Sequence, residues 1–242
     1  MIALLRIACI GMLWVPSQGI HAAATQNREE GKSPERVVST SAKNEVWTEA
    51  FRQMPLSSAV MLNRDNAIPV LLDAFTSNAV VKALLFLPAV SDDFYLINRD
   101  KPRLNIVASN LLDAILALTN ATGLRVTFHA PFLLLHLPRD ILESPCVIRH
   151  AATAQRLQRS AALPHALFKD THWEKLQPVL EKAFGMEIRP GATSEDAWHF
   201  NRHNFSAWGL SNWETLKAVC WTGKTRCIVE AERLVVAQAG ER

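Results

Sequence analysis

Residues 103–137 constrain the fold more than any other part of the chain, because helix and strand patterns alternate within this one stretch. Ser109-Asn110 is a helix start of the N-cap type. Apolar side chains then recur at the i, i+3, i+4 and i+7 spacing of an amphipathic helix, at Leu111, Ala114, Ile115 and Leu118. Gly123 is placed to end that helix, and an alternating strand and an apolar strand follow it, joined at Ala130-Pro131. With a short extended segment before the helix, the stretch predicts a β-α-β-β unit.

The same order of elements recurs near the C-terminus. The expected elements there are an extended segment at 204–210, a helix capped by Ser211-Asn212 and ended at Gly223, and strands at 226–231 and 234–237. A third copy is predicted upstream, over residues 59–98, with its helix at 64–75. Because the copies are unequally spaced, the pattern indicates duplication and not a solenoid.

These units predict an α+β fold made of two small lobes of repeated β-α-β-β units. Hydrophobic residues make up 49% of the chain, which is enough to bury a core. We expect the first lobe over residues 44–139 and the second over 171–242, where a further amphipathic helix is predicted at 173–184. Residues 140–170, which include a basic helix-like piece at 151–163, are expected to connect the lobes.

The first 24 residues have the pattern of an export signal: a short charged start, an apolar run at 7–15, and small residues at 22–24. A membrane anchor is the alternative, but a span needs roughly 20 apolar residues and Pro16 ends the run too early. Residues 25–43 are polar and predict a flexible tether. We therefore expect an exported protein, periplasmic or extracellular, with no membrane span after signal cleavage.

The core of the first unit, ASNLLDAILALTNATGLRVTF, resembles the short N-terminal modules of secretins and of signalling TonB-dependent receptors. The residues that carry this resemblance are Leu104-Asn105-Ile106, Leu111, Ala114, Leu118, Thr122-Gly123, Val126 and Phe128. The resemblance is weaker at 204–237. The whole chain, including PAVSDDFY and WHFNRHNFSAWGLSNWE, resembles a family of uncharacterised exported bacterial proteins, which implies no activity.

Charge and motifs exclude several functions. The chain has 26 basic and 23 acidic residues, a net charge of +3, which is too even to predict a nucleic-acid partner. It has no G-x-S-x-G motif and no glycine-rich phosphate loop, so we expect no catalytic residue and no cofactor. His199 and His203 are candidate metal ligands, but on an extended segment they would lie about 13 Å apart. That distance is too long for one zinc ion, so we expect no metal site.

Two candidate features remain in the C-terminal third. Trp208, Trp221, His199 and His203 form a candidate binding surface, provided that the aromatic rings are exposed. We expect Trp213 to be buried. Cys220 and Cys227 are predicted to face the same helix–sheet interface and to form a disulfide in an oxidising compartment, leaving Cys146 as a single thiol. The alternative is two reduced, buried cysteines.

Three hypotheses of function follow. The first is an exported, non-catalytic interaction or assembly module of the bacterial cell envelope, which binds protein partners through sheet edges. The second is an extracytoplasmic hydrolase whose site is not identified. The third is a small-ligand or glycan binder that uses the Trp-rich C-terminal lobe. An edge strand free of Lys and Pro would favour the first of these.

Overall fold

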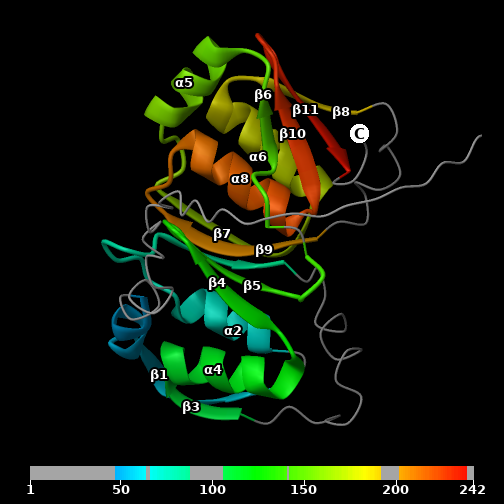
Figure 1. The fold of residues 1–242 in the computed structure, drawn as a ribbon. Coiled ribbons are helices and arrows are strands. Elements are labelled where there is room, and N and C mark those ends of the chain that lie inside the picture. Colours follow the sequence, from blue (N-terminus) through cyan, green and yellow to red (C-terminus); the bar gives the residue numbers. More distant parts are fainter. Residues whose placement is uncertain (1–46, 64–65, 88–105, 141, 192–201, 239–242) are drawn as a thin grey trace, which may run out of the picture. The chain divides into compact units, whose positions relative to one another are not determined.

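The computed structural model describes residues 47–63, 66–87, 106–140, 142–191 and 202–238 (Figure 1). All of these residues fall within one compact unit, which has the mixed α+β fold that the sequence predicts. No helix within these ranges is both long and apolar enough to cross a membrane. The expected signal segment and tether lie outside the described residues.

A five-stranded sheet joins the two halves of the chain. Its strands are β4 (Arg125–His129), β5 (Phe132–His136), β2 (Ala83–Phe86), β9 (Arg202–Trp208) and β7 (His165–His172), in that order. β2 is parallel to β5 and antiparallel to β9. Every residue of β2 and β5 is buried, as expected for the apolar runs ALLF and FLLLH when both faces of a strand are covered.

The helices begin and end at residues that the sequence marks. The described helices are a segment over 47–52, α2 (Ala67–Ala74), α4 (Leu111–Thr122), α5 (Ala151–Arg159), α6 (Trp173–Phe184) and α8 (Asn212–Thr222). The Asn110 side chain caps α4 by accepting a hydrogen bond from the Asp113 backbone N–H at 2.9 Å. Ser211 and Glu214 form a capping box at the start of α8. Gly123 ends α4 in the left-handed region, at φ 71°. The predicted caps and the helix at 173–184 are confirmed.

Each face of the five-stranded sheet carries its own hydrophobic core. Leu84 and Phe86 of β2 belong to a core that includes α2 and α4. Ala83 and Leu85 of the same strand belong to a second core that includes α6 and α8. Figure 1 shows these two pairs of helices on opposite sides of the sheet. The structure therefore differs from two separate lobes: the two cores share one sheet, because β2 and β5 are apolar on both faces and need cover on both.

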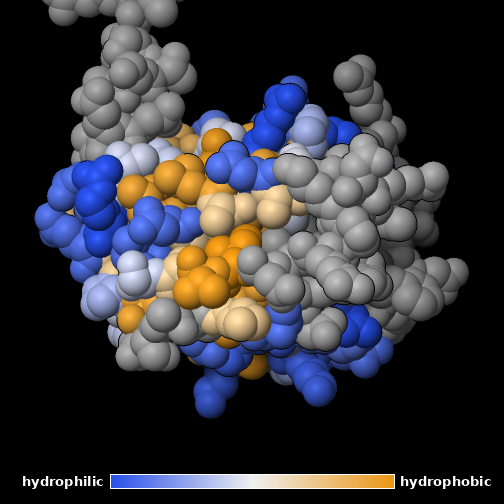
Figure 2. All heavy atoms as spheres, turned by 90° about the horizontal axis from the view of Figure 1, so that it is seen from below, coloured by the Kyte–Doolittle hydropathy of each residue, from blue (hydrophilic) through white to orange (hydrophobic). Residues whose placement is uncertain are grey.

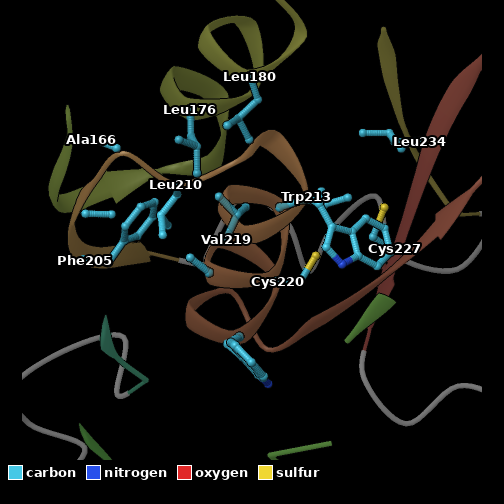
Figure 3. Packing of buried hydrophobic residues seen from close by; sticks show 14 of the residues in the cluster. Ala166, Leu176, Leu180, Phe205, Leu210, Trp213, Val219, Cys220, Cys227 and Leu234 are labelled. Carbon is cyan, nitrogen blue, oxygen red and sulfur yellow. The ribbon is translucent and has the colours of Figure 1, made fainter. Parts of the chain in front are cut away.

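The remaining strands form two further sheets. β1 (Pro55–Leu62) and β3 (Ile106–Asn110) pair antiparallel as a two-stranded sheet, called here the β1–β3 ribbon. A four-stranded sheet has the order β6 (Cys146–Ile148), β10 (Thr225–Val229), β11 (Arg233–Gln238) and β8 (Glu187–Pro190). Figure 3 shows side chains of α8 between Leu176 and Leu180 of α6 on one side and Cys227 of β10 on the other. α8 is thus the centre of the second core.

The β-α-β-β order predicted for two stretches is present, as β3-α4-β4-β5 and as β9-α8-β10-β11. In both stretches the first strand lies in a different sheet from the closing hairpin. β3 pairs with β1, whereas β9 pairs with β2 and β7. The last strand of the expected third copy, at 94–98, lies outside the described residues. Duplication of one unit stays a prediction.

Residues 140–170, expected as a connection between lobes, contain β6, α5 and most of β7. β6 pairs with β10, and β7 is an edge strand of the five-stranded sheet. β7 lacks a regular alternation, because its pairing with β9 is interrupted between Phe168 and Thr171, where Asp170 has a φ of 49°. That irregularity is why the strand is difficult to find in the sequence.

Candidate functional site

The three described residues of the predicted binding surface occupy different environments. Trp208, at the end of β9, is 36% exposed, and its ring stacks on His165 with 3.8 Å between centroids. His203 is buried because α8 covers its face of β9, and Trp221 is buried within α8. His199 lies in the part of the chain that is not described. The structure corrects the expectation of one exposed surface, since His203 and Trp221 lie inside. Trp213 is buried, as predicted.

Three cysteines meet beneath α8. Cys146 and Cys227 are direct partners on the parallel strands β6 and β10, so their side chains point to the same face. Cys220 of α8 contacts both thiols. The hydrogen bond with Cys220, together with burial, raises the pKa of the Cys146 thiol above its usual range. All three are free thiols in this structure. The raised pKa disfavours the thiolate of Cys146, which is the form in which a cysteine acts as a nucleophile.

The disulfide between Cys220 and Cys227 stays a prediction, and the structure sharpens its test. In oxidised protein we expect a Cys220–Cys227 cross-link, worth about 2–3 kcal/mol because the closed loop is short. Peptide mapping without reduction measures the pairing, and Cys146→Ser is the matched control, which should leave the cross-link in place. A Cys146–Cys220 cross-link, or three alkylatable thiols, would contradict the predicted pairing. The Cys220→Ser variant should lose the Cys220–Cys227 cross-link.

A pocket of about 340 Å³ opens beside the end of α8. Residues from the segment after β5, from the end of α8 and from the start of β10 line it. Its lining residues are Leu87, Arg139, Asp140, Glu143, Ser144, Pro145, Cys220, Trp221, Lys224, Thr225 and Arg226. Apolar side chains and charged side chains therefore share one small cavity, which is the usual composition of a small-ligand site.

The charged groups of the pocket are unequally paired. Asp140 has a side chain that is only 6% exposed. It accepts a hydrogen bond from the Leu137 backbone N–H at 2.7 Å, and its other oxygen lies 3.4 Å from Lys224 Nζ. Glu143 is 80% exposed, and its carboxylate lies 3.8 Å from Arg226, which makes a weak surface pair. Among the described residues, Arg139 has no ion-pair partner. The pocket thus carries three cations against two carboxylates.

Within the described part of the chain, no three histidine, cysteine or carboxylate side chains are arranged to hold a metal ion. The pocket holds carboxylates but no histidine, so it lacks the convergent pair that would favour a hydrolase. The pocket can bind a ligand through charge and apolar contact.

The β1–β3 ribbon presents an uncharged surface. Met61 and Val107 are direct partners across the ribbon, so their side chains share one face, and they are 58% and 67% exposed. Figure 2 shows an apolar area, bordered by hydrophilic side chains, on the side of the molecule where β1 and β3 lie. Neither β1 (PLSSAVML) nor β3 (IVASN) contains a charged residue.

No protein-family model, curated protein or solved structure matches the chain. Neither the pocket nor the ribbon could be identified from the sequence alone. Arg139 and Lys224 are far apart in the sequence, and no motif joins them. The ribbon had a weak signal, because the lack of charge in β1 and β3 is visible, but their pairing with each other is not.

Proposed function

We propose that the chain is an exported, non-catalytic interaction module of the bacterial cell envelope, and that it binds an extended segment of a partner protein along β3 of the β1–β3 ribbon. The observation that carries this proposal is the combination of a β3 edge that pairs with no other described strand and the exposed Met61–Val107 pair. Strand addition supplies affinity through backbone hydrogen bonds and specificity through alternate side chains.

β3 lacks the residue types that protect natural edge strands, although the pairing of its partner β1 is irregular between Pro55 and Val60. Proteins block such edges with Lys, with Pro, with inward charges or by keeping the strand very short. β3 has neither Lys nor Pro, whereas β1 begins with Pro55 and β8 ends with Pro190. β7 carries Lys169, and β6 has only 3 residues. β4, the other edge of the five-stranded sheet, also has neither Lys nor Pro, but it begins with the charged Arg125. Among the described edge strands longer than 3 residues, β3 is therefore the one with no Lys, no Pro and no charged residue.

The exposed pair on the ribbon also defines the chemistry of the partner. Val107 and Met61 offer apolar contact area on one face, next to the open edge of β3. A partner strand with a branched apolar side chain opposite Val107 would bury this area, and each such cross-strand pair contributes roughly 0.2–1 kcal/mol. A charged side chain of the partner opposite Val107 would lose its hydration without gaining an ion pair. The partner segment is accordingly extended, uncharged and apolar on one face.

Export and assembly in the envelope are supported by the sequence pattern of residues 1–24 and by the resemblance of residues 103–137 to the short N-terminal modules of secretins. Those modules belong to envelope machines, so a β-α-β-β unit with an open edge fits an assembly role. A glycan-binding function receives less support, because Trp221 and Trp213 are buried and, of the tryptophans that the structure describes, only Trp208 is partly exposed.

The proposal is tested by photo-crosslinking in living cells that export the full chain. A photo-reactive phenylalanine derivative replaces Val107 or, in a second strain, Met61. We expect an adduct with a protein of the envelope fraction, and mass spectrometry should map the cross-link to an extended, uncharged segment. A synthetic peptide of that segment should then bind the purified protein, and Val107→Lys should weaken this binding at least tenfold, because it places a charge beside the open edge.

Val179, an exposed valine on α6, is the matched control. The photo-reactive residue at 179 should give no adduct with the same protein, and Val179→Lys should leave peptide binding unchanged. The proposal is wrong if positions 107 and 179 give the same adducts, if position 107 cross-links only within this chain, or if Val107→Lys binds the peptide as tightly as the parent does.

A further inference from the structure

The pocket beside the end of α8 is a second candidate binding site, separate from the β1–β3 ribbon. Three cationic side chains, Arg139, Lys224 and Arg226, line it together with apolar side chains that include Leu87 and Trp221. Clusters of cations on a protein surface are usually solvated and mixed with carboxylates. An added anion can bind here only if the two carboxylates of the pocket leave some of its cations without a close partner.

The carboxylates leave the arginines available. Asp140 is nearly buried, and its two oxygens are held by the Leu137 backbone N–H and by Lys224 Nζ. Glu143 is 80% exposed and lies 3.8 Å from Arg226, so water competes for this pair. Arg139 is exposed and has no ion pair with any described residue. Two guanidinium groups can therefore bind an added anion, and their planar geometry matches a carboxylate with two parallel hydrogen bonds.

The Trp221 side chain in the apolar part of the pocket is held in place by its neighbours. Its indole N–H already has an acceptor. The Trp221 indole N–H donates to the Glu143 backbone carbonyl at 3.1 Å, and its ring packs edge-on against Phe132 at 5.2 Å. The ring is thereby fixed, and what it offers to a ligand is apolar surface. Leu87 and Pro145 add further apolar surface to the lining.

The backbone at Lys224 also indicates a site under functional constraint. Lys224 has a φ of 53°, in the left-handed region that a side chain other than glycine rarely adopts. Its amino group reaches Asp140, and this ion pair joins the start of β10 to the segment after β5 across the pocket. Strained residues of this kind cluster at binding sites, where the surrounding structure holds them.

We propose that this pocket binds a small organic carboxylate with an aromatic or branched apolar body. The carboxylate binds Arg139 and Arg226, and the apolar body lies against Trp221 and Leu87. A cavity of about 340 Å³ accepts a ligand of this size but not a folded partner. The site does not depend on the ribbon, so either proposal can fail without the other.

The test uses benzoate and 3-phenylpropionate as probes with the purified exported chain. Calorimetry and the NMR signal of the Trp221 indole N–H report binding. We expect at least one of the two carboxylates to bind and to move that signal, and we expect added salt to weaken the binding. The uncharged analogues benzyl alcohol and 3-phenylpropan-1-ol should bind at least tenfold more weakly, as should acetate, which has the charge but not the apolar body.

Arg139→Gln should weaken binding of the carboxylate probe at least tenfold, and Arg139→Lys should restore part of the loss. The matched control is Arg159→Gln, at an exposed position on α5 away from the pocket, which should change nothing. Unchanged melting temperatures would show that the variants are folded. The proposal is overturned if neither carboxylate binds at millimolar concentration, if the alcohols bind equally well, or if Arg139→Gln binds as tightly as the parent.

Discussion

Leu84→Ala and Leu85→Ala are each expected to lower the free energy of unfolding by about 2–5 kcal/mol, because each deletes a fully buried side chain and leaves a cavity. The two residues are neighbours on β2 but point to opposite faces of the five-stranded sheet. Leu84 belongs to the core with α2 and α4, and Leu85 to the core with α6 and α8. In a sheet with one solvent-exposed face, only one of the two changes would have a large effect.

Urea unfolding followed by circular dichroism and by tryptophan fluorescence measures both variants. Because the cores share β2 and its neighbours, we expect one unfolding transition, which both changes shift. Leu116→Ala is the matched control on α4, since Leu116 is 43% exposed, and it should change stability by less than about 0.5 kcal/mol. Two separate transitions, with Leu84→Ala shifting only one of them, would favour two independent lobes and contradict the shared sheet.

Acid should destabilise the protein through His203. This side chain is buried between β9 and α8, with Nδ1 at 3.0 Å from Thr222 Oγ1. Burial lowers the pKa of His203 from its ordinary value of 6.5 to about 4, although a hydrogen bond with the Val219 carbonyl acts in the opposite direction. The folded state therefore keeps His203 neutral at a pH where the unfolded chain already binds a proton.

The sign of the effect follows from this difference. Well above pH 6.5 His203 is neutral in both states and contributes no pH dependence. As the pH falls from 6.5 towards 4, the unfolded state is favoured, at roughly 1.4 kcal/mol for each pH unit. Between pH 7 and pH 4.5, His203 alone should account for a loss of about 2–3 kcal/mol. This loss is smaller than the largest core effects but large for a single titrating group.

Urea unfolding at pH 7 and at pH 4.5 tests this prediction. His203→Gln keeps a polar side chain but cannot titrate, so the stability difference between the two pH values should shrink by about 2–3 kcal/mol. Leu116→Ala, which removes no titrating group and changes an exposed side chain, should show the same acid loss as the parent. If His203→Gln and the parent lose equal stability on acidification, the acid loss does not come from this histidine.

The local structure of the chain could largely be predicted from its sequence, whereas the pairing of its strands could not. Asn110, Gly123 and Ser211 mark helix ends through side-chain and backbone preferences that act within a few residues. The pairing of β2 with β9 depends on contacts between residues far apart in the chain, such as Leu85 with Phe205. Nothing in either strand identifies the other, because both are simply apolar.

The candidate sites were harder to predict for the same reason. The ring of Trp221 could be buried or exposed on sequence grounds, and only the packing of α8 against Phe132 decides it. His203 belongs to a segment rich in polar and aromatic residues that resembles a surface, yet α8 covers it. Cys146 lies well before Cys220 in the sequence, and the register of β6 on β10 is what brings the two thiols together.

The position of β9 in the five-stranded sheet has a consequence for how the chain is made. β2 and β5 are complete when residue 136 has been synthesised, but β9 joins them only after residue 208. Until then one edge of β2 is open, and the second core still lacks the side chains of β9 and α8. Such surfaces favour aggregation in incomplete chains. If the chain is exported as proposed, a holding factor or rapid delivery of its last third would protect these surfaces until β9 is in place.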